Sequence, residues 1–297
     1  MAIKIGTASW TDKTLIACKR FYTSGSSSAE ARLRYYASQF PLVEVDSSYY
    51  ALPSVQNATL WAQRTPAEFV FNIKAFRLLT GHQTGREALP KDIEMAIPET
   101  GKKNLYYRDV PPDVRDELWG RFLEALGPLC QVGKLGAVLF QFPPWLTNGT
   151  EGRAHLDECV RRMDCYTTAV EFRNKSWLDE KHVESTLAYE REHGIVHVVI
   201  DAPVGVTNRA QTVWAVTNPE LAVVRLHGRN AETWNAVGAT SAAARFNYDY
   251  SEDELRELAR PIRELAGQAT NTHVVFNNCY EDYATRNARS LLQMIGQ

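Results

Sequence analysis

Residues 135–141 read Leu135-Gly136-Ala137-Val138-Leu139-Phe140-Gln141, a short apolar run that ends on a polar side chain. So short a run does not suit an ordinary helix, and its near-continuous apolar character is typical of a buried parallel strand. Pro143 and Pro144 then turn the chain, and residues 151–163 show the spacing of an amphipathic helix. The stretch therefore predicts one strand–helix unit.

The same unit recurs along the whole chain. The other expected strands are Ile3–Ala8, Leu42–Asp46, Phe69–Lys74, Thr168–Arg173, His197–Asp201, Ala222–His227 and His273–Asn277. The expected helices are Ser28–Phe40, Val55–Arg64, Pro112–Gln131, Glu151–Met163, Glu180–His193, Ser251–Gly267 and Glu281–Ile295, with the sixth helix indistinct. Strand–helix alternation predicts an α/β fold with a parallel sheet, and about eight units favour a single (β/α)8 TIM-like barrel over residues 1–297. An open, doubly wound sheet is the alternative.

One connection is unusually long. It runs from Arg77 to Val110, after the third strand, and contains three lysines, two tyrosines, His82 and Arg108. Long loops in compact domains are commonly lids or binding loops. We interpret residues 77–110 as a basic, aromatic insertion over the barrel mouth, with a solvated surface excursion as the alternative.

Composition narrows the class of protein. The chain is 44% hydrophobic and 23% charged, as in globular proteins, and its net charge of −2 does not support a dedicated nucleic-acid binder. No membrane span or secretory signal is visible, and the five cysteines form no C-x-x-C pair. These features predict a cytoplasmic protein that does not insert into a membrane.

Charged and amide side chains collect at the carboxyl ends of the expected strands, where barrel enzymes carry their active sites. Period-two alternation aims pairs such as Glu44 with Asp46 and Arg225 with His227 in one direction. The candidate catalytic residues are Glu44, Glu171, Asp201 and His227. The candidate substrate-binding residues are Trp10, Asp46, Tyr49, Lys74, Gln141, Arg173, Trp177, Arg225 and Asn277.

Several known chemistries fit this set poorly. Gln141 and the Arg225/His227 pair stand after the fourth and seventh strands, where the common barrel glycosidases place their carboxylates. The chain has no G-x-S-x-G, P-loop or G-x-G-x-x-G, and no H-E-x-x-H spacing marks a metal site. We therefore expect no cofactor, although a divalent metal held by the acids and His227 remains an alternative.

Several segments together resemble the DUF72 (YecE-like) family of TIM-barrel proteins of unknown function. They are Ile5–Trp10, Phe21-Tyr22, Leu33–Phe40, Val43–Pro53, Trp61–Pro66, Leu139–Pro144, Val170–Trp177, Arg225–Arg229 and Phe276–Asn278. They follow the family's order from one end of the chain to the other. The resemblance implies the barrel and a shared cleft at the strand ends, and it supplies no reaction. The insertion at residues 77–110 looks longer than in the shortest members.

The leading hypothesis is an enzyme, a hydrolase or an isomerase or lyase, that acts on a small polar or anionic molecule by acid–base chemistry. Lys74, Arg173 and Arg225 hold the carboxylate or phosphate group. Glu44 or Glu171 serves as base and His227 as acid. Two alternatives stay open: a metal-dependent phosphodiesterase or nuclease, and a non-catalytic module that binds nucleic acid or protein.

Overall fold

Eight parallel strands close into a barrel, in the order β1-β10-β9-β8-β7-β6-β3-β2. The computed structural model describes residues 2–22, 24–99, 101–203, 210–234 and 246–296. The barrel strands are β1 (Ala2–Ala8), β2 (Leu42–Val45), β3 (Val70–Lys74), β6 (Leu135–Gln141), β7 (Thr168–Glu171), β8 (Val196–Asp201), β9 (Leu221–Leu226) and β10 (Asn271–Phe276). The predicted (β/α)8 barrel is confirmed, and the open sheet is excluded.

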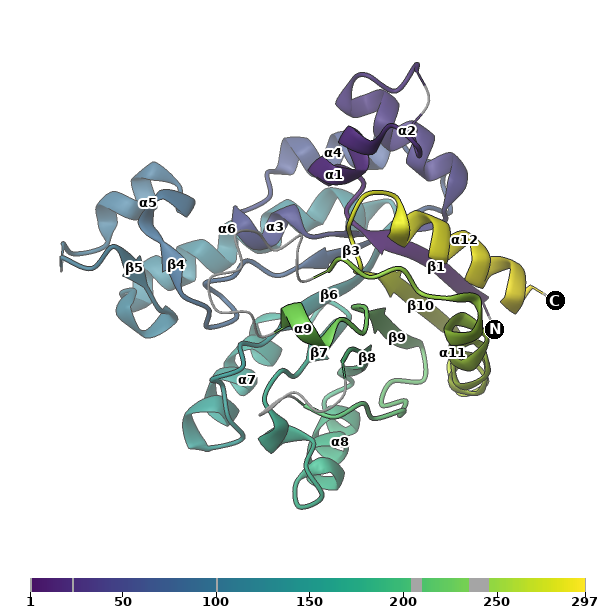
Figure 1. Cartoon of the computed structure of the whole chain (residues 1–297). Helices are drawn as coiled ribbons and strands as arrows, with labels where there is room; N and C mark the ends of the chain where they lie inside the picture. The colour runs from purple at the N-terminus through teal and green to yellow at the C-terminus, as the bar shows by residue number, and fades with distance from the viewer. Residues whose placement is uncertain (1, 23, 100, 204–209, 235–245, 297) are drawn as a thin grey trace.

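Helices surround the barrel (Figure 1). They are α1 (Lys13–Cys18), α2 (Ala29–Gln39), α3 (Ser47–Tyr50), α4 (Val55–Gln63), α6 (Pro112–Gln131), α7 (Thr150–Arg162), α8 (Val183–Glu192), α9 (Ala231–Trp234), α11 (Glu252–Ala266) and α12 (Tyr283–Ile295). Every amphipathic stretch expected as a helix forms one. Between β8 and β9, residues 210–220 contain no helix, and residues 204–209 of this connection lie outside the described part. None of the described helices is both long and apolar enough to span a membrane.

Helix α11 shows how local sequence sets these elements. The Ser251 side chain accepts a hydrogen bond from the Glu254 backbone, and the Glu254 carboxylate accepts one from the Ser251 backbone. This capping box satisfies two backbone N–H groups that the first turn leaves without partners. The apolar residues of the helix fall on one buried face, which packs toward the barrel: Leu255, Leu258, Ile262 and Leu265.

Alternate residues of each strand fill the barrel interior. The apolar members of this set form a cluster separate from the main core: Ala137, Leu139, Ala169, Val196, Val198, Ile200, Leu221 and Val223. His273 of β10 lies 3.1 Å from the amide oxygen of Asn72 of β3. Because β1 and β2 separate these strands in the barrel, the contact crosses the interior. The charged side chains of the barrel mouth also point into the interior, one or two residue layers nearer the carboxyl ends of the strands.

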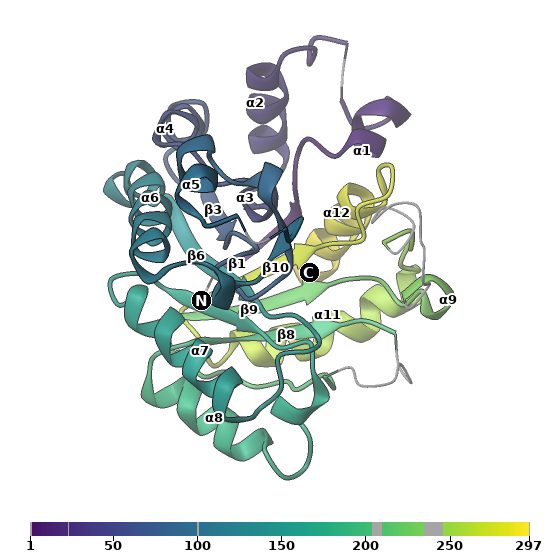
Figure 2. The same cartoon turned by 90° about the vertical axis from the view of Figure 1, so that its left-hand side faces the viewer.

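The insertion after β3 has its own secondary structure. It contains β4 (Thr84–Gly85) paired with β5 (Asn104–Leu105), the short 3₁₀ turns η1 (Arg86–Ala88) and η2 (Tyr107–Asp109), and α5 (Lys91–Ala96). Figure 1 shows these elements beyond one end of the barrel, away from both chain ends, and Figure 2 turns that end toward the viewer.

Contacts with α6 and α7 hold the insertion at one side. Tyr107 donates to Glu158 at 2.6 Å and accepts from the Trp119 indole at 2.9 Å. Arg121 of α6 donates to Asp92 of α5 at 3.1 Å. Tyr107, expected on an aromatic lid, is therefore part of the packing against the helices. The three lysines of the insertion are exposed, and its role as a lid stays a prediction.

Candidate active site at the barrel mouth

Arg225 forms the centre of a buried ionic cluster at the carboxyl end of the barrel. Its guanidinium donates to Glu44 at 3.0 and 2.5 Å, and it also pairs with Glu171. Each of the three residues is at most 1% exposed. Such a cluster tolerates burial because every charge has an opposite partner with good geometry. Glu44 and Glu171, predicted as catalytic bases, are therefore bound to arginine.

A second layer of polar side chains lies over this cluster. Arg173 pairs with Glu171 and donates to the amide oxygen of Gln141 at 3.1 Å. Arg225 reaches the same Gln141 oxygen at 3.3 Å. Burial raises the pKa of Glu171, but Arg173 and Arg225 outweigh it and hold that pKa well below its usual range. Glu171 is thus a fixed anion, and Arg173 and Gln141 are the partly exposed members of the group.

His227 is enclosed beneath Arg173 and is fully buried. The amide nitrogen of Asn277 lies 2.8 Å from its Nδ1, and its Nε2 lies 3.4 Å from Glu171. The Arg173 guanidinium, which can only donate, lies 3.3 Å from the same Nε2. Burial lowers the pKa of His227 to about 3; Glu171 opposes this, and Arg173 adds to it. The ring is neutral near pH 7, and its predicted role as acid stays a prediction.

Lys74 and Asp46 differ from these paired residues. Lys74, the last residue of β3, is partly exposed, and its side-chain amine forms no hydrogen bond or ion pair with any residue in the described ranges. Its Nζ lies 4.4 Å from the centre of the Tyr49 ring. Asp46 follows β2 directly, and its side chain neither caps α3 nor pairs with a base in the described part of the chain.

The pKa values of both groups move toward neutrality. Burial lowers the pKa of Lys74 to about 8, and nearby Arg225 adds to the effect. Burial raises the pKa of Asp46, while Lys74 opposes that rise. An acid and a base whose pKa values approach each other are the groups that acid–base catalysis requires near neutral pH.

Aromatic rings continue from Lys74 to the rim of the mouth. Tyr49 meets the His82 ring edge-on at 5.2 Å, and His82 meets Trp145 at 5.7 Å. Trp145 is 53% exposed and also faces Tyr106 of the insertion. Tyr49 was expected here. His82 was assigned only to the insertion, and Trp145 was missed, although its position directly after Pro143 and Pro144 at the end of β6 is a usable signal.

Asp201 does not join the cluster, contrary to its predicted role. Its carboxylate accepts three hydrogen bonds from Arg229, at 2.9, 3.1 and 3.1 Å, and one from the Tyr250 hydroxyl at 2.7 Å. In β8 the inward-facing residues are Val196, Val198 and Ile200, so Asp201 is one position out of phase. It anchors the loop after β9 from outside the barrel interior.

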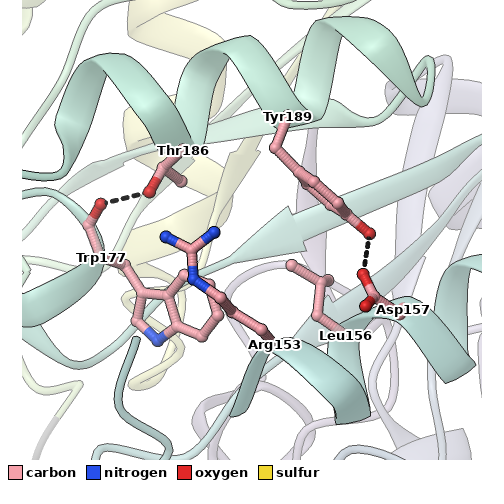
Figure 3. A pocket seen from close by; sticks show the side chains of 6 residues that line it. All are labelled: Arg153, Leu156, Asp157, Trp177, Thr186 and Tyr189. Carbon is pink, nitrogen blue, oxygen red and sulfur yellow. Dashed lines mark hydrogen bonds between the residues drawn. The ribbon is translucent and has the colours of Figure 1, made fainter. Parts of the chain in front are cut away.

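The two tryptophans expected at the mouth also lie elsewhere. Ser9 adopts a left-handed conformation with φ of 73°, and Trp10 then packs edge-on against Trp61 at 5.8 Å, in the main core. Trp177 stacks on Phe172 at 4.4 Å. It lines a pocket of about 100 Å³ with side chains of α7 and α8, on the outside of the barrel (Figure 3).

Metal ligation has little support in this geometry. No group of three or more His, Cys, Asp or Glu side chains within the described ranges is placed to hold a metal ion. Glu44 and Glu171, the deepest carboxylates of the mouth, are held by Arg225. The metal-dependent alternative would require these ion pairs to break.

Comparison with known proteins identifies relatives along the full chain. The family described as "Protein of unknown function DUF72" matches residues 4–297. The UPF0759 protein YunF of Bacillus subtilis (strain 168) is 31% identical over 295 residues, which cover 99% of this chain and 94% of that protein.

Solved structures agree with the fold. A DUF72 family protein of Enterococcus faecalis V583 is 26% identical with a TM-score of 0.80, over 99% of this chain and 96% of that one. A DUF72 family protein of Thermotoga maritima MSB8 is 27% identical with a TM-score of 0.78, and the match covers 100% of both chains.

Proposed function

The chain belongs to the DUF72 family, whose function is unknown, and from the geometry of its barrel mouth we propose that it is an enzyme acting on a small anionic molecule. In this proposal Lys74 and Asp46 transfer protons to and from the bound molecule. The Glu44–Arg225–Glu171 cluster is a rigid floor that shapes the site and holds Arg173 in place. These roles revise the expectation that the two glutamates act as bases.

The observation that carries the proposal is the division of the mouth into paired and unpaired charges. Two carboxylates and two guanidiniums neutralise one another at the floor. Lys74 and Asp46 stand above them, partly exposed and without an ion pair in the described part of the chain. Keeping such groups in a desolvated site costs free energy. They add nothing to the stability of the barrel, so their presence supports a functional role.

The preference for an anion follows from the local field. Burial lowers the pKa of His82 to about 3; Lys74, Arg77 and Arg173 lower it further, and Glu171 opposes them. Three cations and one opposing carboxylate thus act on one point of the mouth, beside the Tyr49 ring, and the cations outnumber the carboxylate. A carboxylate or phosphate would be attracted to that point, with Arg173 and the amides of Gln141 and Asn277 as hydrogen-bond partners.

An exchange reaction tests the proposal even while the product is unidentified. Small oxo- and hydroxy-acids and sugar phosphates are incubated with the protein in D₂O, and proton NMR follows the loss of carbon-bound hydrogen. We expect protein-dependent exchange in at least one compound, about 10²- to 10⁴-fold slower in Lys74→Met and Asp46→Asn. Lys91→Met, which changes an exposed lysine of α5, is the control and should exchange at the wild-type rate.

The proposal fails if the two mouth variants exchange as fast as the control. It also fails if no anion in the set either raises the melting temperature or exchanges hydrogen. Nucleic-acid binding and metal-dependent hydrolysis remain predictions that no contact in the described structure favours.

A further inference from the structure

In the structural lysines of this protein, the side-chain amine is hydrogen-bonded or ion-paired. Lys134 is buried, and its Nζ donates to the backbone oxygens of Ala62 and Thr65 at 2.6 and 2.8 Å and to the Thr65 hydroxyl at 3.1 Å. These bonds satisfy the end of α4 and use every proton of the ammonium group. Lys102, on the insertion, pairs with Asp109 at 2.9 Å.

The amine of Lys74 has none of these acceptors among the described residues. It lies against the face of Tyr49, and it stays partly exposed at the mouth. An ammonium so placed has given up hydration without gaining hydrogen bonds. The arrangement favours the neutral amine, whose lone pair is then available to a bound molecule.

We propose that Lys74 is a nucleophile that forms a protonated imine with the carbonyl group of an anionic substrate, either an oxo-acid or a phosphorylated aldehyde or ketone. The inference deepens the proposed function and rests on it, because it uses the same site and names the substrate class. Lysines that act in this way are commonly desolvated and placed near other cations.

The surrounding charges support this role. Burial lowers the pKa of Lys74 to about 8; Arg225 and Arg173 add to this effect, while Glu44 and Glu171 oppose it. At pH 7.5 roughly a quarter of the amine is then neutral, against about one part in a thousand for a solvated lysine. The gain in nucleophile concentration is on the order of a hundredfold.

Asp46 supplies the proton transfers that the step needs. The Lys74 nitrogen attacks the carbonyl carbon, the C–N bond forms, and the carbonyl oxygen takes a proton from Asp46. The nitrogen then returns a proton to the Asp46 carboxylate, Asp46 gives this proton to the hydroxyl, the hydroxyl leaves as water, and the C=N⁺ bond forms. One amine, one carbonyl and one proton become one iminium ion and one water, with no oxidant or reductant. Burial raises the pKa of Asp46, while Lys74 opposes that rise.

Reductive trapping tests the inference. The protein is incubated with pyruvate, dihydroxyacetone phosphate or glyceraldehyde 3-phosphate in the presence of sodium cyanoborohydride, which reduces an imine to a stable secondary amine. Intact-mass and peptide mass spectrometry then locate the adduct. We expect one adduct per chain, on Lys74, with at least one of these anions. Uncharged dihydroxyacetone should label Lys74 at least tenfold more slowly than its phosphate.

Three variants and a pH series complete the test. Lys74→Arg keeps the positive charge and should give no adduct, while Lys91→Met should label like the wild type. Should the arginine variant fail to fold, the wild-type labelling rate still reports the role, because it must rise with pH through about 8. Asp46→Asn should slow the labelling about tenfold or more without moving it to another lysine.

Adducts spread over exposed lysines, or unchanged in Lys74→Arg, would overturn the inference. Anions that bind or exchange hydrogen without ever trapping on Lys74 would overturn it as well, yet would leave the proposed function standing. No binding and no exchange would remove the proposed function itself.

Discussion

The guanidinium of Arg225 binds both oxygens of the Glu44 carboxylate, at 3.0 and 2.5 Å, across 181 positions of sequence. This contact joins β9 to β2 through the interior of the barrel, and Glu171 of β7 shares the same guanidinium. Three strands are thereby held at fixed spacing below the mouth. The cluster also holds Arg173, which pairs with Glu171.

Removing Arg225 should destabilise the protein strongly. Arg225→Ala leaves Glu44 and Glu171 buried with too few partners, and we expect a loss of about 3–5 kcal/mol of unfolding free energy. Urea unfolding followed by circular dichroism measures it. Arg256→Ala, which breaks exposed pairs with Glu252 and Asp253 on α11, is the matched control and should cost about 1 kcal/mol or less. Equal losses in both variants would contradict the structural role of the cluster.

Lys74→Met should have the opposite effect on stability. The folded protein lowers the pKa of Lys74 from 10.5 to about 8, so the charged amine is less favourable in the folded state than in the unfolded one. That penalty develops as pH falls from 10.5 to about 8 and is fully present at neutral pH. We expect the variant to be more stable by roughly 1 kcal/mol at pH 7, while it loses function. A clearly lower melting temperature would contradict this.

Buried histidines, His227 and His273 among them, should make the protein sensitive to acid. Burial lowers the pKa values of His227 and His273 to about 3, well below the ordinary 6.5. Both rings are neutral in the folded state, whereas the unfolded chain protonates them below pH 6.5. The free energy of unfolding is therefore unaffected by them above pH 6.5 and decreases progressively as pH falls toward 3. Each histidine can lower the free energy of unfolding by up to about 1.4 kcal/mol per pH unit in that pH range.

The variant His273→Gln tests this pH dependence, since Asn72 keeps its bond to the Ala137 backbone. Unfolding free energies at pH 7.5, 6.0 and 5.0 should decline less steeply than in the wild type. His193→Gln changes an exposed histidine and should leave the slope unchanged. A parallel decline in all three proteins would contradict the assignment.

The turn after β9 requires glycine. Gly228 has φ of +86°, and a Cβ at this position would lie 2.5 Å from the Cβ of Tyr248. Gly228→Ala combines backbone strain with a steric clash, so we expect it to cost about 2 kcal/mol or more. Because His227 precedes this glycine, anion binding at the mouth should weaken as well. Thermal unfolding and a ligand-induced melting shift measure the two effects.

The barrel could be predicted from sequence because each unit repeats the same local signals. The run at residues 135–141 forms β6 with the same bounds, and Pro112 begins α6 as expected. Alternation also indicated which residues of β9 face the barrel interior, because Arg225 and His227 interrupt its apolar residues. In β8 every residue before Asp201 except His197 is apolar, so the pattern did not show which residues face the barrel interior. Asp201 was therefore misplaced.

The pairing of charges could not be predicted in the same way. Glu44, Glu171 and Lys74 have similar positions at strand ends, and only the distances across the barrel decide which are bound to arginine. The place of Trp10 depends on the left-handed backbone at Ser9. This conformation is unusual for serine, and the sequence gives no signal for it. Trp177 was expected at the mouth from its neighbours, yet the turn η3 (Lys175–Trp177) carries it to the outer layer.

The accessibility and basicity of Lys74 test its proposed role most directly. Labelling with a trace amine reagent across pH 6–11, followed by peptide mass spectrometry, gives the titration of this one amine. We predict a midpoint near pH 8, together with protection of Lys74 by an anionic carbonyl compound that binds the mouth. A midpoint at the ordinary 10.5, or an amine that no reagent reaches in the folded protein, would contradict that role.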